Sequence, residues 1–318
     1  MDEMSMVKIP EITLRGGVRA MPVVAMGTAV LPFSPAETKA AIVHAIELGY
    51  RHFDTASLYE TERPLGEAVA EALRLGLVAS REDLFVTTKL WSDQAHPELV
   101  LPALKNSLRD LEMEYVDLYL IHIPISSKPG STPRFPIKRE EVMSMDLKSV
   151  WEAMEECQRI GLTRSIGVSN FSQHMLEKLL LTATVPPAVN QVEMNVAWQQ
   201  SSLREYCKEK GIHVTAYSPL GGSGGPLAGN QMLGTEIIRK MAKSRGKTAA
   251  QACIGVSLVV KSFRKERLEE NLQIFGWELC DDECKIISQF PPHKRLNLNK
   301  MLSVEGKLSL DLSDYEFP

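Results

Sequence analysis

The sequence lacks a long hydrophobic run and a block of positive charge. No window approaches the roughly eighteen unbroken apolar residues that a membrane-spanning helix needs, so no span is expected. The first residues carry charges from Asp2 to Arg15 and no apolar stretch, so no secretory signal is expected either. The formal net charge of −4 is spread along the chain, which argues against nucleic acid or an anionic membrane as the main partner. Such a charge is compatible with an enzyme acting on small molecules without requiring one.

Cysteines are few and irregularly placed. The five are Cys157, Cys207, Cys253, Cys280 and Cys284. An odd number scattered through helix-like segments is typical of a reducing cytoplasm rather than of a disulfide framework. The last two cysteines and His293 offer too few ligands for a metal site. We therefore predict a cytoplasmic protein without a metal.

The chain also lacks a low-complexity linker and a shift in composition, so we predict one domain over residues 1–318. Its 44% hydrophobic and 24% charged residues are typical of a globular domain with a substantial core. No G-x-G-x-x-G motif follows the first strand, which weakens the alternative of an open dinucleotide-binding sheet. Residues 221–229 are rich in glycine at a different spacing, and they form either a surface loop or a cradle for phosphate.

Short β-branched runs alternate with amphipathic helical patterns. The predicted strands are residues 23–26, 52–55, 84–88, 116–121, 165–168, 189–193, 213–217 and 257–260. The predicted helices are residues 35–48, 62–75, 97–111, 147–160, 173–181, 202–210, 235–254 and 265–274. Nearly continuous apolar strands, each followed by a helix, indicate a parallel sheet with a covered outer face. Eight such units favour an α/β fold of the TIM type, a closed (β/α)8 barrel, preceded here by a hairpin that turns at Gly16 and Gly17.

Polar side chains gather where the predicted strands end, which is where barrels of this kind carry their active sites. Reading these ends in order gives Asp54, Tyr59, Lys89, His122, Ser169, Asn170, Gln191, Glu193, Tyr217, Ser218, Lys261 and Ser262. Each residue alone has an ordinary structural explanation, such as a helix cap, a surface charge or a packed ring. Their occurrence at one rim favours an active site.

Four of these residues form a group suited to carbonyl reduction. A tyrosine phenol has a pKa of about 10 in water, and a nearby ammonium stabilises its phenolate. Tyr59 and Lys89 are the candidates, and Asp54 can hold the ammonium in place and keep it charged. His122 can donate a hydrogen bond to the carbonyl oxygen. The Asn and Gln amides can hold a nicotinamide carboxamide, and Tyr217 can stack on the ring.

Ordered motifs follow most strands: GYRHFDTA at 49–56 with Tyr59, TKLW at 88–91, DLYLIH at 117–122, GVSNF at 167–171, VNQVE at 189–193, AYSPL at 216–220 and VKSF at 260–263. With these motifs the chain resembles the aldo-keto reductase family over about residues 12–291, and in particular its plant members. The resemblance implies an NADPH-dependent monomer that reduces a small-molecule carbonyl compound. It assigns Tyr59 as general acid, Lys89 and Asp54 as the pair that tunes it, and His122 as the orienting residue. It also implies a hairpin plug in the barrel and a C-terminal tail over its mouth.

The resemblance further implies a set of cofactor-binding residues. These are Ser169, Asn170, Gln191, Tyr217, Ser218, Leu220, Lys261, Ser262, Phe263, Arg267, Glu270 and Asn271. The first three match groups that bind the carboxamide, and Ser218 and Leu220 match the segment under the pyrophosphate. Lys261, Ser262 and Arg267 match the grip on the 2′-phosphate, and cations there favour NADPH over NADH. Glu270 and Asn271 match positions near the adenine.

Two departures from the family pattern stand out. Ile123 follows His122 where the family usually has tryptophan, so we expect a wider and less aromatic substrate pocket with Trp91 as its remaining aromatic wall. The helix before the last strand needs about a dozen residues to span a strand of roughly 18 Å. Residues 248–254 supply about half of that, and relatives carry an extra stretch between Ile254 and Gly255.

The shortened segment is expected to strip apolar cover from the barrel and to strain the link to Lys261. Three explanations stay open: a mis-predicted exon boundary, a variant that compensates locally, and a degraded copy. The leading hypothesis is an NADPH-dependent reductase of an aldehyde or ketone in plant metabolism. The alternatives are a non-catalytic NADPH-binding regulatory subunit and a degenerate paralogue weakened by the short helix.

Overall fold

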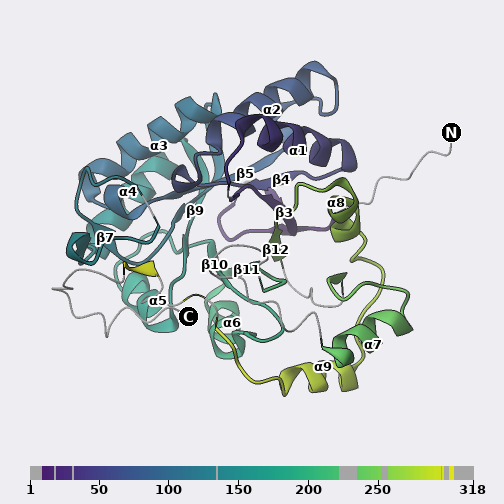
Figure 1. The fold of residues 1–318 in the computed structure, drawn as a ribbon. Coiled ribbons are helices and arrows are strands. Elements are labelled where there is room, and N and C mark those ends of the chain that lie inside the picture. The colour runs from purple at the N-terminus through teal and green to yellow at the C-terminus, as the bar shows by residue number, and fades with distance from the viewer. Residues whose placement is uncertain are drawn as a thin grey trace.

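The computed structural model describes residues 9–17, 19–30, 32–133, 135–221, 235–251, 257–294, 296 and 301–303. Parallel strands close into an eight-stranded barrel with helices outside it (Figure 1). The strands follow one another round the barrel in the order β3, β4, β5, β6, β9, β10, β11 and β12. The last strand, β12, returns to pair with β3. The predicted (β/α)8 barrel is confirmed.

The barrel strands lie within a few residues of their predicted positions. Their bounds are β3 Val24–Gly27, β4 His52–Asp54, β5 Phe85–Leu90, β6 Val116–Ile121, β9 Thr163–Ser169, β10 Val189–Glu193, β11 His213–Tyr217 and β12 Ser257–Val260. Side chains alternate between the barrel interior and the helix layer, as the pleat requires. On β5, Phe85 packs inside the barrel, whereas Val86 and Leu90 belong to the large core between barrel and helices.

The helices that follow the strands match the predicted patterns closely, with one exception. Their bounds are α1 Pro35–Leu48, α2 Glu62–Arg74, α3 Pro97–Leu111, α4 Leu147–Arg159, α5 Gln173–Leu180, α6 Ser201–Lys210, α7 Glu236–Ser244 and α8 Lys265–Leu272. Local signals explain their ends. The Ser34 side chain caps α1 by accepting from the Glu37 amide at 3.5 Å, and Gly49 ends that helix at φ 103°. None of the helices in the described ranges is long and apolar enough to cross a membrane.

A two-stranded hairpin, β1 Glu11–Thr13 and β2 Ala20–Pro22, closes the bottom of the barrel. Its buried side chains Leu14 and Met21 pack against Phe85 and Val189. These two residues begin β5 and β10, so the contact lies at the amino ends of the strands. The hairpin is the predicted plug, and it leaves the carboxyl ends of the strands for the site.

The helical stretch predicted over residues 235–254 is interrupted, because α7 runs over Glu236–Ser244 and ends there. Gly246 takes the left-handed conformation at φ 61°, and the Lys247 amide donates to the Ala242 carbonyl at 2.9 Å. This is the usual glycine ending of a helix. The Thr248 amide then donates to Gln251 Oε1 at 2.9 Å, and the Gln251 amide donates to Thr248 Oγ1 at 3.3 Å, as at the start of a new helix. Residues 252–256, with Cys253 and the shortened junction, lie outside the described residues.

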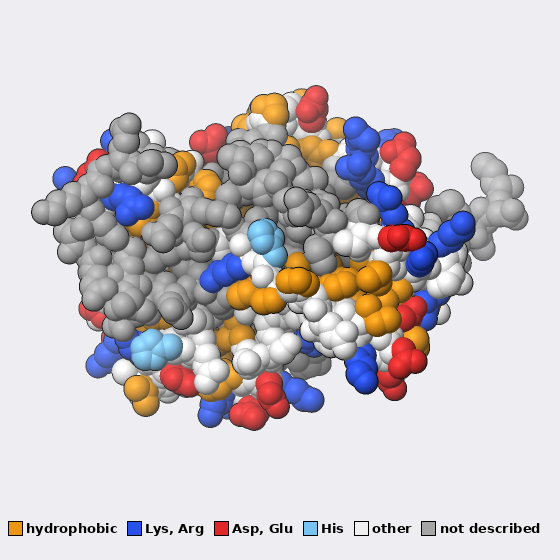
Figure 2. All heavy atoms as spheres, turned by 60° about the horizontal axis from the view of Figure 1, so that its bottom comes forward, with side chains coloured by type: hydrophobic (Ala, Val, Ile, Leu, Met, Phe, Trp, Pro, Cys, Tyr) orange, Lys and Arg blue, Asp and Glu red, His pale blue; other side chains and the backbone are white. Residues whose placement is uncertain are grey.

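The helix α7 packs mainly away from the barrel. Its buried residues Ile238, Met241 and Ala242 form a cluster with Ile287 of an additional helix, α9 Asp281–Ser288. Within the described ranges, the large core takes residues from α1 to α6 and α8 and none from α7. In Figure 1, α7 and α9 lie together below α8. Figure 2 brings the bottom of that view forward, and hydrophobic side chains form a band across the face that it shows.

Candidate active site

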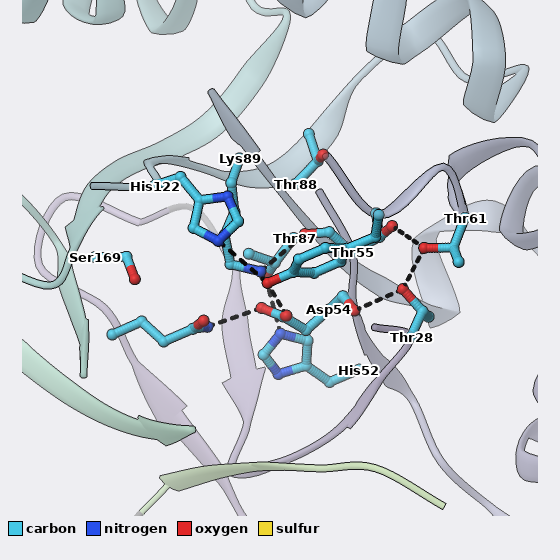
Figure 3. A network of polar contacts seen from close by, with 12 residues as sticks. Thr28, His52, Asp54, Thr55, Thr61, Thr87, Thr88, Lys89, His122 and Ser169 are labelled. Carbon is cyan, nitrogen blue, oxygen red and sulfur yellow. Dashed lines mark hydrogen bonds and ion pairs between the residues drawn. The ribbon is translucent and has the colours of Figure 1, made fainter. Parts of the chain in front are cut away.

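The carboxyl ends of β4, β5 and β6 bring Asp54, Lys89 and His122 together (Figure 3), and the predicted catalytic residue Tyr59 lies beside them. Asp54 ends β4, Lys89 lies near the end of β5, and His122 directly follows β6. Tyr59 ends the short 3-10 helix η1 Ser57–Tyr59, which leads from β4 to α2. Because parallel strands end at the same rim, residues far apart in the sequence become neighbours.

Asp54 and Lys89 form a buried ion pair. The Lys89 Nζ lies 2.6 Å from Asp54 Oδ1 and donates to the Thr55 carbonyl at 2.8 Å. The two side chains are 0% and 4% exposed. The second oxygen of Asp54 accepts from Gln191 Nε2 at 2.7 Å. Burial lowers the pKa of Lys89, and the adjacent Asp54 carboxylate opposes that shift.

Tyr59 is held between this pair and His122. Its hydroxyl lies 3.2 Å from His122 Nε2, and the Lys89 Nζ lies 5.0 Å from the centroid of its ring. Burial, with a smaller contribution from the Asp54 charge, raises the pKa of the Tyr59 phenol. That Lys89 stabilises the phenolate of Tyr59 stays a prediction, because burial and Asp54 are the causes that raise the pKa of the phenol here. The phenol is held in its protonated form, which is the form that donates a proton.

His122 is held neutral. Burial, and then the positive charge of Lys89, lower the pKa of its imidazole well below the usual range. A neutral ring has one N–H donor, and Nε2 is the nitrogen that faces the Tyr59 hydroxyl. The Trp91 ring packs edge to face on the imidazole, with centroids 4.9 Å apart. His122 is therefore placed as a neutral polar group beside the phenol and not as a second cation.

Polar side chains of β9 and β10 lie beside the four residues. Asn170 Nδ2 donates to the His122 carbonyl at 3.0 Å and to Ser169 Oγ at 3.1 Å. The Tyr217 hydroxyl donates to Asn170 Oδ1 at 2.7 Å. Ser169, Asn170 and Gln191 are 1%, 4% and 4% exposed, and these bonds, with that of Gln191 to Asp54, give them partners within the protein. The amides and the hydroxyl fit the carboxamide of a nicotinamide, and Tyr217 offers a ring next to them.

Cationic groups follow β12 on the next side of the rim. Lys261, Ser262 and Phe263 come directly after this strand, and Arg267 lies in the first turn of α8. Lys261 and Arg267 are exposed, and the Ser262 hydroxyl accepts from the Arg264 amide at 3.1 Å. A helix N-terminus with exposed cations fits a phosphate group. These residues therefore fit the phosphate end of a nicotinamide cofactor, and the amides described above fit its nicotinamide end.

The remaining predicted cofactor residues are placed less uniformly. Ser218 and Leu220 follow β11, with Ser218 in the left-handed region at φ 50°. Glu270 is partly exposed on α8. Asn271 is buried and hydrogen-bonds to Tyr50, so the structure places it at the contact between α8 and α1. Of the glycine-rich stretch 221–229, only Gly221 lies within the described residues.

The predicted substrate walls lie in a separate apolar cluster at the mouth. Trp91 and Ile123 pack there with Ile137, Met301 and Leu302. The Ile137 amide donates to the Met301 carbonyl at 2.8 Å, so residues 301–303 pair with the loop that follows β6. That loop also carries a small two-stranded sheet, β7 Ser126–Ser127 and β8 Val142–Met143, which the sequence did not predict. The tail over the mouth is thus tied to the loop by backbone hydrogen bonds.

Sequence reasoning missed the polar residues that hold the segment carrying Tyr59. The Thr61 hydroxyl lies 2.7 Å from the Thr28 hydroxyl and 2.9 Å from the Thr55 hydroxyl. The next residue, Glu62, is buried and accepts from Thr88 Oγ1 at 2.6 Å. In the sequence Thr61 and Glu62 are only a helix start, so nothing there indicates their partners.

Comparisons with known proteins agree with this geometry. Residues 23–291 match the model of the aldo/keto reductase family. The (1S)-1,7-diacetoxy-luvungin A aldo-keto reductase of Citrus sinensis is 51% identical over 94% of this chain and 95% of its own. The NADPH-dependent codeinone reductase 1-4 of Papaver somniferum is 50% identical over 94% of each chain. The crystal structure of an aldo-keto reductase from Bombyx mori in complex with NADP matches at a TM-score of 0.81 and 37% identity, over 91% of this chain and 95% of that one.

The family model covers most of the chain, the plant relatives are reductases, and the barrel is shared with a structure that binds NADP. The chain belongs to the aldo/keto reductase family, and it is an NADPH-dependent carbonyl reductase.

Proposed function

We propose that Tyr59 is the general acid in the reduction of an aldehyde or ketone of plant metabolism to an alcohol. The observation that carries the proposal is the pairing of the protonated Tyr59 hydroxyl with neutral His122 at 3.2 Å, beside the buried Asp54–Lys89 pair. When bound, NADPH supplies the hydride that reduces the carbonyl carbon. The chain supplies the proton and positions the carbonyl group.

The proton transfer follows from the charges around Tyr59. A carbonyl oxygen placed between the phenol and His122 Nε2 accepts two hydrogen bonds, which stabilise negative charge as it develops on that oxygen. As the phenol gives up its proton, the Lys89 ammonium stabilises the phenolate that remains. Asp54 keeps the ammonium charged and, through Gln191, is linked to the carboxamide side of the site. This order of events needs a phenol that starts protonated, as its raised pKa provides.

We assign the other rim residues to binding. Ser169, Asn170 and Gln191 would hold the nicotinamide carboxamide, with Tyr217 stacked on the ring. Ser218 and Leu220 would support the pyrophosphate; Lys261, Ser262, Phe263 and Arg267 the adenosine phosphate; and Glu270 the adenine, with Asn271 beside it. Trp91 and Ile123 would line the substrate pocket. Support for these roles comes from their common rim and from the exposed cations after β12.

Steady-state oxidation of NADPH against a panel of aldehydes and ketones tests the mechanism. Replacing Tyr59 by Phe removes the donated proton and keeps the ring, so kcat should fall by about 10²- to 10⁴-fold. The Kd for NADPH, measured by fluorescence, should stay close to the wild-type value. Tyr206→Phe, on the distant helix α6, is the control and should turn over normally. Equal rates in the wild type and Tyr59→Phe would sink the mechanism.

We also propose that the chain is one domain, acts as a monomer and resides in the cytoplasm. The tail at residues 301–303 pairs with the loop near Ile137, so the two parts of the chain fold together. Cys157 and Cys207 are free buried thiols and Cys280 and Cys284 are free exposed thiols, as in a reducing compartment. Size-exclusion chromatography with light scattering tests the monomer, and a fluorescent fusion viewed in plant cells tests the location.

A further inference from the structure

A second buried carboxylate lies behind the strand that carries Lys89. Side chains on β5 alternate, so Lys89 points into the barrel and Thr88, its neighbour, points toward the helix layer (Figure 3). Glu62, the first residue of α2, meets Thr88 there at 2.6 Å. Glu62 is 6% exposed, which is rare for a glutamate without a compensating partner.

Several partners of Glu62 oppose the effect of its burial. Burial, the largest influence, leaves the pKa of the carboxyl group raised, and the charge of Asp110 adds to that rise, whereas the hydrogen bonds from Thr88 and Ser107 and the charge of Lys89 favour the carboxylate. Glu62 also lies in the first turn of α2, where the helix dipole stabilises a negative charge. A buried carboxylate that receives two hydroxyl hydrogen bonds at a helix start has the partners that an anion needs.

Glu62 is also tied to both halves of the proton donor. It lies three residues after Tyr59 and bonds to the residue before Lys89, so one hydrogen bond links the start of α2, directly after the segment that carries Tyr59, to β5. Its charge reaches Lys89 as well: with Asp54 as the larger contributor, Glu62 opposes the lowering of the Lys89 pKa that burial causes.

We propose that Glu62 is a positioning residue for the reduction, acting as a second counter-charge to the Lys89 ammonium from the far side of β5. The proposal rests on the function assigned above to Tyr59 and Lys89. Asp54 pairs with the ammonium inside the barrel, and Glu62 adds a buried negative charge on the outer side of the strand. Asp54 and Glu62 together then keep the Lys89 ammonium charged and the Tyr59 phenol protonated over the pH range in which the enzyme works.

Other titratable and charged groups lie near Lys89 and Glu62. Those that act on or respond to Lys89 are Asp54 and His52 of β4, Tyr59 of η1 and His122 after β6. Those that act on or respond to Glu62 are Asp110 of α3 and Tyr119 of β6. Both histidines have lowered pKa values and stay neutral in the alkaline range, so they do not titrate where the test is made. Asp110 carries the same sign of charge as Glu62 and stays in place in the variants.

The test is the pH dependence of kcat/KM for carbonyl reduction at saturating NADPH, in the wild type and in Glu62→Gln. Glutamine keeps an oxygen that can accept from Thr88 and removes only the charge. Losing a nearby negative charge makes both the ammonium and the phenol give up their protons more readily. The midpoint of the alkaline fall in activity should therefore move to lower pH by about one unit. An unchanged midpoint overturns the proposal.

A matched control and a second variant make the result specific. Asp117 is another buried carboxylate, bound by Arg19 and Arg81 at the amino end of β6, so Asp117→Asn costs stability but should keep the wild-type midpoint. If Glu62→Gln does not fold, the double variant Glu62→Leu with Thr88→Val removes the charge together with the hydroxyl bonded to it and should shift the midpoint in the same direction. A wild-type midpoint in whichever of these Glu62 variants folds sinks the proposal. Loss of the Tyr59→Phe effect would instead sink the proposed function.

Discussion

Breaking the buried Asp54–Lys89 pair should destabilise the protein strongly. Asp54→Asn leaves the Lys89 ammonium, 0% exposed, with no charged contact partner and with the Thr55 carbonyl as its acceptor in the described structure. Lys89→Met leaves the Asp54 carboxylate with the Gln191 amide. An uncompensated buried charge costs about 3–5 kcal/mol, so each single variant should lose about that much of the free energy of unfolding.

The double variant is the decisive measurement. Once both charges are gone, neither is left without its counter-charge, so the double should cost about 2–3 kcal/mol less than the sum of the singles. Urea unfolding followed by tryptophan fluorescence gives the free energies, with similar m-values as a check on two-state behaviour. The exposed pair Glu236–Lys240, with side chains 80% and 74% exposed, is the control and should couple by no more than about 0.5 kcal/mol. Additive costs for Asp54 and Lys89 would refute the view that the pair is desolvated.

Two further variants test packing and a buried imidazole. Gly66→Ala places a Cβ 2.2 Å from the Leu111 carbonyl oxygen. The overpacking should cost about 3 kcal/mol, more than the gain of about 1 kcal/mol in helix propensity. Urea unfolding should therefore show a net loss of about 2 kcal/mol in the free energy of unfolding. The exposed neighbour Glu67→Ala should stay within about 0.5 kcal/mol of the wild type, and a neutral or stabilising Gly66→Ala contradicts the close contact. Burial lowers the pKa of His213 to about 4, so this group stabilises the fold fully above its unfolded value of about 6.5 and loses that contribution as pH falls through 4. The stability advantage of the wild type over His213→Gln should therefore shrink by up to about 3 kcal/mol between pH 7 and 4, as unfolding at fixed pH values measures, and a constant difference argues against it.

Helix ends illustrate where local sequence signals predict the structure and where they do not. Ser34 and Gly49 mark the ends of α1, and both act in the structure as caps. Gly246 is a signal of the same kind, but the amphipathic pattern on both sides of it predicted a helical stretch over residues 235–254 without a boundary at this glycine. The left-handed conformation of Gly246 ends α7 there. Residues 281–288 form α9, although the sequence suggested only helix-like character near Cys280 and Cys284.

The sequence by itself determined the barrel and the identity of the rim residues. Strand and helix periods are local properties, and each strand of a parallel barrel places its last residues at the same end, so Asp54, Lys89 and His122 could be brought together before any coordinates were known. The environment of these side chains could not be predicted in the same way, because their burial and the charges near them depend on what packs around them. The tertiary structure decided that the Tyr59 phenol is buried beside Asp54, and both effects raise its pKa. It also decided that Glu62 meets Thr88, since that contact joins a helix start to the outer side of a strand 26 positions away.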